Sequence, residues 1–167
     1  MATTDFNPGI ISDAADRESS DEAGRDAVIV GASLAGCATA ILLGRAGARV
    51  ALVEKQPDTA AFKRMCSHYI QASAVPTIER LGLLERILAA GGLRSGVHAW
   101  TRWGWIVPPP DEALRGVNLR REVLDPMVRE TAASTPGVEL MLGLAAERLL
   151  RDDGTVRGVA VRDRDGE

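Results

Sequence analysis

DAVIVGASLAGCATAILLGRAGARVALVEK, residues 26–55, is the stretch that decides the fold. The apolar run Ala27–Val30 stops at a glycine and is rich in β-branched residues, as in a strand buried on both faces. From Leu34 to Ala46 the pattern is helical with small residues on one side, and a second apolar run, Arg49–Glu54, follows. Strand, helix and strand over so short a length predict a right-handed βαβ unit with parallel strands.

The loop that joins the first strand to the helix is Gly31-Ala32-Ser33-Leu34-Ala35-Gly36. Gly31 permits the tight turn out of the strand, and Gly36 permits the helix to pack closely against the sheet. The first turn of the helix then presents unpaired backbone N–H groups, and its dipole favours a negative group. We therefore predict a dinucleotide pyrophosphate site, formed by Gly31, Ser33, Leu34, Ala35 and Gly36.

Ser33 stands where the dinucleotide fingerprint has its middle glycine, which lets the backbone approach the pyrophosphate. A serine adds a β-carbon that would crowd the ligand, but its hydroxyl can donate a hydrogen bond to a phosphate oxygen. We favour the hydrogen bond, because serine is small and the rest of the motif is intact. The alternative for the whole loop is a glycine-rich turn that binds nothing.

The second predicted strand ends at Glu54, roughly 20 residues after the glycine loop, where the fingerprint has an acid. A carboxylate there can accept hydrogen bonds from both hydroxyls of a ribose, and it repels a 2′-phosphate. This repulsion favours FAD or NAD over NADP, and the agreement in spacing of the strand, the loop and the acid favours a dinucleotide site over a turn that binds nothing. Lys55 follows directly, and we include it in the predicted site.

The rest of the chain continues the α/β pattern. We predict a helix over 72–90, strand-like runs over 96–106 and 115–119 joined by the loop Pro108-Pro109-Pro110, a helix over 122–133 with Pro126 near its start, and a third parallel strand over Val138–Leu142. Residues 145–151 and 155–163 alternate around Asp152-Asp153-Gly154, which predicts an antiparallel hairpin. The predicted fold class is α/β, a Rossmann-like βαβ domain with a parallel sheet and a small antiparallel β-meander.

Composition excludes several classes of protein. Hydrophobic residues make up 46% and charged residues 26%, which is ordinary for a soluble globular protein. The net charge is −3 without any basic block, which argues against nucleic acid and acidic membrane surfaces as partners. Only two cysteines, Cys37 and Cys66, are present, so we expect no disulfide framework and a cytoplasmic location. Polar residues and glycines interrupt the most apolar segment, 27–43, so we expect no integral membrane segment.

At residues 26–55 the sequence resembles the FAD-binding start of flavoprotein monooxygenases of the para-hydroxybenzoate hydroxylase type. Geranylgeranyl reductases and flavin-dependent halogenases share this opening, and the resemblance extends more weakly to residue 163. It implies FAD as the cofactor and NAD(P)H as a transient reductant. In Phe62-Lys63-Arg64-Met65-Cys66, Arg64 occupies the place where the family has an arginine near the flavin phosphates.

A second segment, Leu119-Arg120-Arg121-Glu122-Val123-Leu124-Asp125, resembles the family's arginine-x-x-leucine signature before a helix. The resemblance implies that Arg121 faces the FAD pyrophosphate or ribityl chain, with Arg120 as the fallback if the match is displaced by one residue. The alternative for Arg64 and Arg121 is a solvated surface charge.

The resemblance also implies segments that these residues do not contain. Relatives continue with an Asp-Gly motif after another strand and a later Gly-Asp motif that binds the flavin, whereas Asp165-Gly166 reads as a hairpin turn. We therefore expect a C-terminally incomplete domain over 26–167, preceded by a disordered acidic tail over 1–25. The expected function is the FAD-binding portion of an oxidoreductase that hydroxylates, reduces or halogenates a small organic or lipid-like substrate. The alternative is a non-catalytic module or one half of a split flavoprotein, with a partner that supplies the missing strands.

Several other reactive or aromatic residues receive no role. His68 and His98 are far apart in sequence without ligand spacing around them, so we predict neither a metal site nor a catalytic residue. Cys66 is expected to be a free thiol and Cys37 a small packing residue. Trp100, Trp103 and Trp105 are expected either to cover the core or to line a substrate pocket.

Overall fold

The computed structural model describes residues 9–12, 24–107 and 115–163, and these form two compact units. The first unit comprises Met1–Ala61 and Met127–Glu167, and the second comprises Phe62–Pro126. The predicted proline-rich loop at 108–110 and the predicted turn at Asp165-Gly166 lie outside the described residues, as does most of the predicted acidic tail.

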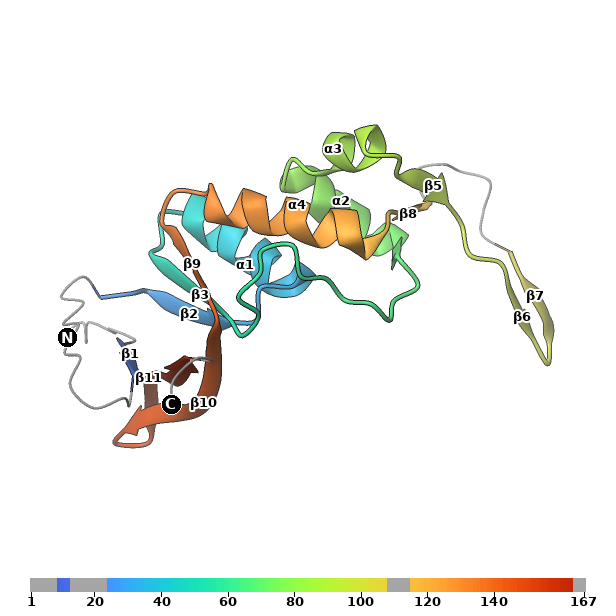
Figure 1. The fold of residues 1–167 in the computed structure, drawn as a ribbon. Coiled ribbons are helices and arrows are strands. Elements are labelled where there is room, and N and C mark those ends of the chain that lie inside the picture. Colours follow the sequence, from blue (N-terminus) through green and yellow to red (C-terminus); the bar gives the residue numbers. More distant parts are fainter. Residues whose placement is uncertain (1–8, 13–23, 108–114, 164–167) are drawn as a thin grey trace, which may run out of the picture. The chain divides into compact units, whose positions relative to one another are not determined.

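The first unit is built on a parallel sheet with the strand order β2-β3-β9, visible in Figure 1. The strands are β2 (Ala27–Val30), β3 (Val50–Glu54) and β9 (Val138–Leu142). In β3, all residues from Val50 to Val53 are fully buried, which accounts for the uninterrupted apolar run that precedes Glu54. The three predicted parallel strands are confirmed, and among the described strands β2 lies at one edge of the sheet.

Helix α1 (Leu34–Arg45) connects β2 to β3 and packs on the sheet through its small residues. Cys37, Ala40, Ile41 and Gly44 are buried on this face. A Cβ atom placed on Gly44 would lie 2.8 Å from the carbonyl oxygen of Pro136. The small side chains therefore set how closely the helix approaches the segment before β9.

The predicted β-meander is also present. Strands β10 (Leu144–Asp152) and β11 (Thr155–Asp163) pair antiparallel. Asp153 and Gly154 connect them with positive φ angles of 45° and 78°, the conformation that the Asp-Gly sequence favours in a tight hairpin. Val159 and Val161 of β11 join Val53 in a small buried cluster, which fixes the meander against the parallel sheet.

The expectation of a disordered tail over 1–25 is wrong for residues 9–12. The sequence Gly9-Ile10-Ile11-Ser12 forms β1 (Gly9–Ser12), which pairs in parallel with β11 from Gly158 to Val161. The tail as a whole is acidic and polar, which indicates disorder, although the two isoleucines of this short run favour a strand. The open edge of β11 supplies the backbone groups with which it pairs.

The second unit contains short elements. Residues 72–90, predicted as helical, form the 3₁₀ turn η1 (Ala72–Ala74), α2 (Val75–Arg80) and α3 (Leu84–Ala89). Gly82 has a φ of +74° and separates α2 from α3, because this conformation does not continue a helix. A small antiparallel sheet has the order β4-β8-β5, formed by β4 (Tyr69–Ile70), β8 (Gly116–Asn118) and β5 (Leu93–Ser95).

Helix α4 (Arg121–Ala133) begins in the second unit and ends in the first. It starts one residue before the predicted helix over 122–133 and continues through Pro126. Its most buried residues include Leu124, Asp125, Val128, Arg129 and Ala132. Two of these are charged, so each must have polar partners in the interior.

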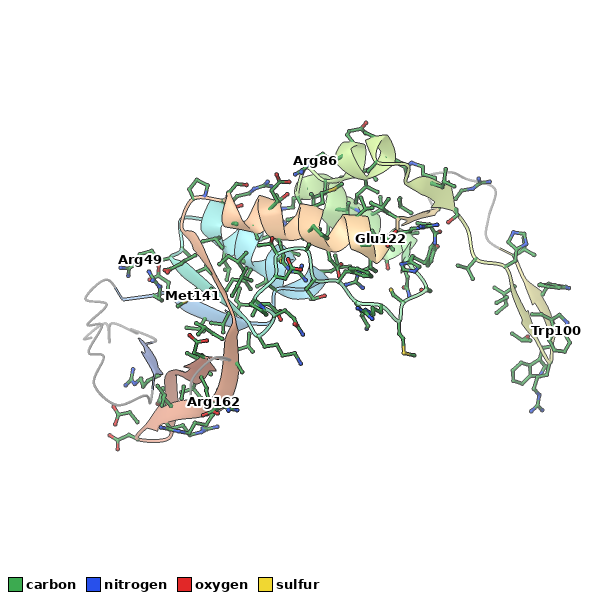
Figure 2. The ribbon with its side chains drawn as sticks, in the orientation of Figure 1. Arg49, Arg86, Trp100, Glu122, Met141 and Arg162 are labelled. Carbon is green, nitrogen blue, oxygen red and sulfur yellow. The ribbon has the colours of Figure 1, made fainter. Side chains whose placement is uncertain are left out.

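The three tryptophans lie on a hairpin instead of in the core. Strands β6 (Ala99–Thr101) and β7 (Gly104–Ile106) pair across Arg102 and Trp103, where one strand was predicted over 96–106. Trp100, Trp103 and Trp105 are 68%, 83% and 67% exposed, and Figure 2 shows Trp100 on this hairpin. The expectation that they cover the core is therefore wrong.

No helix in the part of the chain that the structure describes is both long and apolar enough to cross a bilayer.

Candidate functional site

The predicted dinucleotide loop leaves β2 through a left-handed turn. Gly31 has a φ of +100°, a conformation that L side chains rarely adopt, and its N–H donates to the carbonyl oxygen of Val53 at 2.7 Å. Ser33 is extended, with φ −96° and ψ −171°, and caps the N-terminus of α1. Its carbonyl oxygen accepts the first helical hydrogen bond, from the N–H of Cys37 at 2.9 Å. The loop therefore brings the N-terminus of α1 to the carboxyl end of β2.

Gly36 has no room for a side chain. A Cβ atom at this position would lie 1.9 Å from the carbonyl oxygen of Gly31 and 3.4 Å from Cγ2 of Ile29. At Gly31, by contrast, a Cβ atom would meet no other atom within 4 Å. The loop therefore presses against its own helix on one side and is open on the other, as a cradle for a ligand requires.

Glu54 lies at the end of β3 and holds the loop directly. Its Oε2 accepts a hydrogen bond from the backbone N–H of Ala32 at 2.8 Å, and its Oε1 accepts one from the N–H of Gln56 at 2.9 Å. A carboxylate offers about four acceptor sites, so both oxygens retain a lone pair for another donor. The sequence indicated the acid but not its bond to the loop.

Arg129 is a site residue that the sequence analysis missed. Its Nε donates to the carbonyl oxygen of Ala32 at 2.8 Å, and its Nη1 donates to the carbonyl oxygens of Thr59, at 2.7 Å, and Ala61. The residue is only 5% exposed. The signal in the sequence was a charged residue next to the apolar Val128 within the predicted helix, and such a charge is also compatible with a solvated position. Arg129 thus ties the dinucleotide loop to the connection that follows β3.

The second unit contains Arg121 in a buried polar cluster. Its Nε donates to Oδ1 of Asp125, its Nη1 lies 3.5 Å from Sγ of Cys66, and its backbone N–H donates to Nδ1 of His68 at 3.1 Å. Asp125 also accepts the backbone N–H of Lys63 at 3.1 Å. The alternative reading of Arg121 as a solvated surface charge is therefore wrong, because its side chain is only 7% exposed.

These contacts shift two ionisation equilibria. The backbone N–H of His68 and then the guanidinium of Arg121 stabilise the thiolate and lower the pKa of Cys66. Burial disfavours the charged form of Arg121, but hydrogen bonds to Asp125 and Cys66 outweigh this and raise its pKa. Arg121 therefore keeps its charge, and Cys66 is a more acidic thiol than an ordinary cysteine.

The remaining predicted basic residues are exposed. Lys55 follows β3 in the first unit, and Arg64 lies in the segment between Phe62 and β4 in the second. Arg120, the fallback for Arg121, is exposed and forms an ion pair with Glu122 at 3.1 Å. Between these neighbouring arginines, the structure therefore distinguishes a buried Arg121 from a solvated Arg120.

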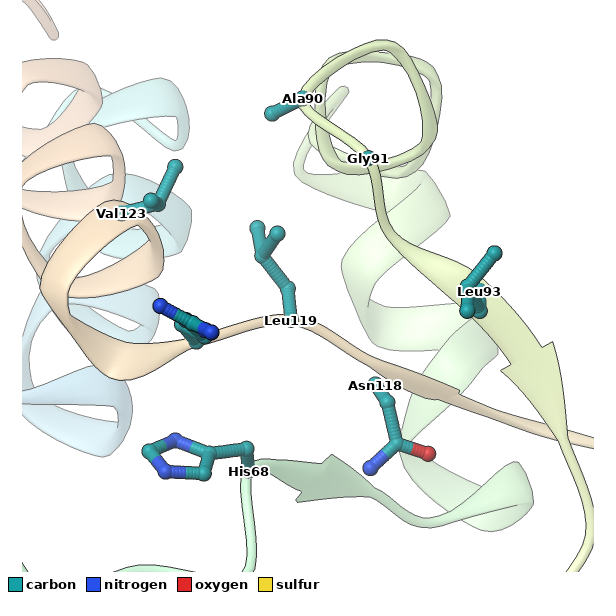
Figure 3. Close-up of a pocket in the computed structure, with 8 residues that line it drawn as sticks. His68, Ala90, Gly91, Leu93, Asn118, Leu119 and Val123 are labelled. Carbon is teal, nitrogen blue, oxygen red and sulfur yellow. The ribbon is translucent and has the colours of Figure 1, made fainter.

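A pocket of about 270 Å³ lies in the second unit, between the end of α3 and the start of α4 (Figure 3). His68 and Asn118 provide ring and amide groups at its wall. The other lining residues are Ala90, Gly91, Leu93, Leu119, Arg120 and Val123. His68 therefore lies next to a cavity, although the sequence analysis assigns it no role.

Comparison with known proteins identifies the family. The family model described as FAD binding domain matches residues 25–167. The chain belongs to the FAD binding domain family. The resemblance to the FAD-binding part of flavoproteins is thereby confirmed, and FAD is the cofactor of the family.

Curated relatives match most of this FAD binding domain but only part of their own length. Squalene epoxidase 2, mitochondrial, of Arabidopsis thaliana is 28% identical over 157 residues, which cover 89% of this chain and 26% of the relative. Menaquinone reductase of Mycolicibacterium smegmatis is 34% identical over 145 residues, which cover 83% of this chain and 34% of the relative. The chain thus spans about a quarter to a third of the length of these relatives.

Solved structures have the same fold. A triple mutant of the flavin-dependent brominase Bmp2 superposes with a TM-score of 0.71 at 26% identity, over 86% of this chain and 35% of the brominase. PqsL of Pseudomonas aeruginosa, described as a probable FAD-dependent monooxygenase, superposes with a TM-score of 0.66 at 23% identity. The match covers 86% of this chain and 39% of PqsL. At so low an identity the similarity concerns the fold alone.

Among the described residues, no three His, Cys, Asp or Glu side chains lie together as metal ligands would. Cys37 and Cys66 are not joined in a disulfide.

Proposed function

We propose that the first unit binds the ADP half of FAD, with the pyrophosphate over Gly31–Gly36 and the adenosine ribose on Glu54. The observation that carries the proposal is the joint geometry of loop and acid. Gly36 lies against the Gly31 carbonyl, the opposite side of the loop is open, and the Glu54 carboxylate is fixed beside it. These features meet the steric and hydrogen-bonding needs of a dinucleotide.

Within this proposal, the loop residues have separate tasks. The backbone of Ser33, Leu34 and Ala35 at the start of α1 faces the phosphates, and the Ser33 hydroxyl donates to a phosphate oxygen. Lys55, Arg64 and Arg121 are proposed as cationic contacts to the cofactor, on the strength of the family resemblance. Arg121 supports this role by keeping a permanent charge, since hydrogen bonds raise its pKa.

The whole protein is proposed to be an FAD-dependent oxidoreductase of the monooxygenase type, with NAD(P)H as the reductant. Bound FAD supplies the redox chemistry, and the chain described here contributes binding and orientation. Relatives named for squalene and menaquinone support a small organic or lipid-like substrate. The two cysteines without a disulfide support the cytoplasm as its location.

Titration of the purified protein with FAD tests the proposal. Isothermal calorimetry should show that FAD and ADP each bind with a stoichiometry of one. The two ligands should compete, because they occupy the same site. FMN, which lacks the AMP part of FAD, should bind far more weakly, and NADP should bind more weakly than NAD because Glu54 repels a 2′-phosphate. Equal affinities for FAD and FMN, or a preference for NADP, would contradict the assignment.

A second candidate is a nucleotide-binding module without catalysis, or one part of a split flavoprotein. The observation that favours it is the length of the match, about a quarter to a third of the curated relatives. The DNA downstream of this sequence separates the candidates. An in-frame continuation with an Asp-Gly and a later Gly-Asp motif would favour the enzyme, whereas their absence would favour the module.

A further inference from the structure

Arg129 is a buried cation whose hydrogen bonds all go to neutral groups. Its guanidinium donates to the backbone carbonyls of Ala32, Thr59 and Ala61, and the residue is 5% exposed. Within the described part of the chain, no carboxylate forms an ion pair with it. Burying an uncompensated charge is unfavourable, so a stable fold normally pairs it with an anion. An anionic ligand at the adjacent loop would supply that charge.

The hydrogen bond to Ala32 also fixes the orientation of the loop. The Ala32 N–H donates to Glu54 and the Ala32 carbonyl accepts from Arg129, so the residue is held on both sides. A trans peptide is planar, and its C=O and N–H point in opposite directions. With its C=O turned toward Arg129, the Ala32–Ser33 peptide must direct the Ser33 N–H away from Arg129. That N–H belongs to the N-terminus of α1, where an anion binds.

The same guanidinium reaches the connection after β3. Thr59 and Ala61 accept from one nitrogen, Nη1, while Nε is used for Ala32. Lysine has a single nitrogen at its end and cannot reproduce this fork. Arg129 therefore joins two backbone segments of the first unit, the dinucleotide loop and the connection after β3, through a geometry that only arginine provides.

We infer that Arg129 is a positioning residue for the pyrophosphate of a bound dinucleotide. It acts through the Ala32–Ser33 peptide and through its buried positive charge, without contacting the ligand. The inference rests on the proposed function and adds to it a residue on α4, far from the glycine motif in sequence. The electrostatic attraction from its charge is strongest for the ligand group closest to the loop, which is the pyrophosphate.

The test compares ligands with and without phosphates. The variant Arg129→Met should lose about 10- to 100-fold in affinity for ADP and FAD, the loss typical of one hydrogen bond to a charged group, because the Ser33 N–H is no longer held toward the pyrophosphate. Its affinity for adenosine should stay within about twofold of the wild-type value, because adenosine carries no phosphate. Arg162→Met is the matched control, since Arg162 is exposed on β11 and pairs with Glu147, and it should change neither affinity. Equal losses for ADP and adenosine, or no loss, would overturn the inference.

Two further measurements keep the result interpretable if Arg129→Met folds poorly. Arg129→Lys retains the charge without the fork and should keep an intermediate ADP affinity. Arg129→Ala should regain ADP affinity when methylguanidinium is added, whereas a loss that no cation restores would overturn the inference.

Hydrogen exchange separates this inference from the proposed function. In the free protein, the amides of residues 32–34 should exchange faster in Arg129→Met than in the wild type, with global stability followed by urea denaturation. If the wild type bound neither FAD nor ADP, the proposed function would fail, whereas unchanged exchange at these amides would overturn the positioning role alone.

Discussion

The carboxylate of Glu54 accepts a hydrogen bond from the backbone N–H of Ala32 at 2.8 Å, across 22 positions of sequence. The acid at the end of β3 thereby fixes the glycine loop that begins at the end of β2. In the proposed complex the same carboxylate also receives the ribose hydroxyls. Glu54 is thus expected to hold the loop and to bind the ribose. A substitution removes both interactions together, whereas ligand analogues that lack a hydroxyl test the ribose contact alone.

Replacing Glu54 should weaken nucleotide binding. We expect Glu54→Ala to cost about 1–3 kcal/mol of FAD binding, the size of a lost hydrogen bond to a charged group. Glu54→Gln should lose less, because the amide keeps one oxygen acceptor. Calorimetric titration with FAD measures both effects.

Analogues of ADP can then show how much of the lost binding free energy comes from the ribose contact and how much comes from the altered loop. If Glu54 binds the ribose, removing the 2′-hydroxyl should weaken binding to the wild type but change little in Glu54→Ala. Asp26→Asn is a suitable control, because Asp26 bonds Arg49 at the opposite end of the parallel strands. The outcome to the contrary is that removing either ribose hydroxyl lowers the affinity of the wild type and of Glu54→Ala by the same factor. That result would show that Glu54 acts only through the loop.

Two closely packed glycines of α1, Gly36 and Gly44, allow a matched comparison. A Cβ atom on Gly36 would lie 1.9 Å from the Gly31 carbonyl oxygen, and one on Gly44 would lie 2.8 Å from that of Pro136. We expect Gly36→Ala and Gly44→Ala each to reduce the free energy of unfolding by about 1–3 kcal/mol, as overpacking does. Only Gly36→Ala should also reduce FAD affinity of the folded protein, since Gly44 lies at the far end of the helix. Urea denaturation and FAD titration together check this, and a similar loss of affinity in Gly44→Ala would argue against a local role of Gly36.

The sequence was sufficient where the signal was local. The βαβ unit follows from apolar runs and from Gly31, Gly36 and Glu54, whose spacing matches a strand, a tight turn, one helix and the next strand. The Asp153-Gly154 hairpin follows from residues that adopt positive φ angles readily. In each case the residues that carry the pattern lie within a single supersecondary unit, the βαβ unit or the hairpin, and tertiary context does not override them.

Long-range contacts account for what was missed. Arg129 bonds Ala32 across 97 positions and Thr59 across 70, and no periodicity reveals such partners. The strand at Gly9–Ser12 depends on an edge near the other end of the chain. The hairpin of the tryptophans depends on Gly104, whose φ of +115° permits the turn within a run that otherwise reads as one strand.

Cys66 should react as an unusually acidic thiol. Hydrogen bonds from the His68 N–H and from Arg121 lower its pKa, so more thiolate is present near neutral pH than for an ordinary cysteine, whose pKa is about 8.5. We expect the rate of alkylation at Cys66 to rise with pH and to reach half its maximum below that value. Buried Cys37 should react slowly throughout and serves as the internal reference.

The variant Arg121→Met isolates the side-chain contribution to this effect. It should move the midpoint of Cys66 alkylation to higher pH while leaving the backbone contribution of His68 in place. Mass spectrometry of tryptic peptides can follow the two cysteines separately. A midpoint at or above that of a free thiol in the wild type would contradict the assigned contacts.

The 167 residues alone should not oxidise NAD(P)H faster than free FAD does. Positioning of reacting groups contributes much of an enzyme's rate, and this chain spans only about a quarter to a third of its curated relatives. The absorbance of NADPH, followed with flavin-loaded protein and with free FAD, provides the measurement. Turnover clearly above the free flavin would show that these residues suffice to position both reactants.

The edge strand β2 should limit the stability of the isolated chain. Among the described strands it pairs only with β3, and Val30 is 58% exposed. A short apolar edge with unpaired backbone groups favours association with another strand. At roughly 25 cal/mol per Å², a few hundred Å² of apolar surface left in water forgoes several kcal/mol, against a typical net stability of about 5–15 kcal/mol. We therefore expect concentration-dependent elution in size-exclusion chromatography and a broad thermal transition. Val30→Lys should shift the elution toward the monomer, because a charge on an edge strand opposes pairing. A monodisperse monomer with a cooperative transition above ~60 °C would show instead that the chain protects this edge by itself.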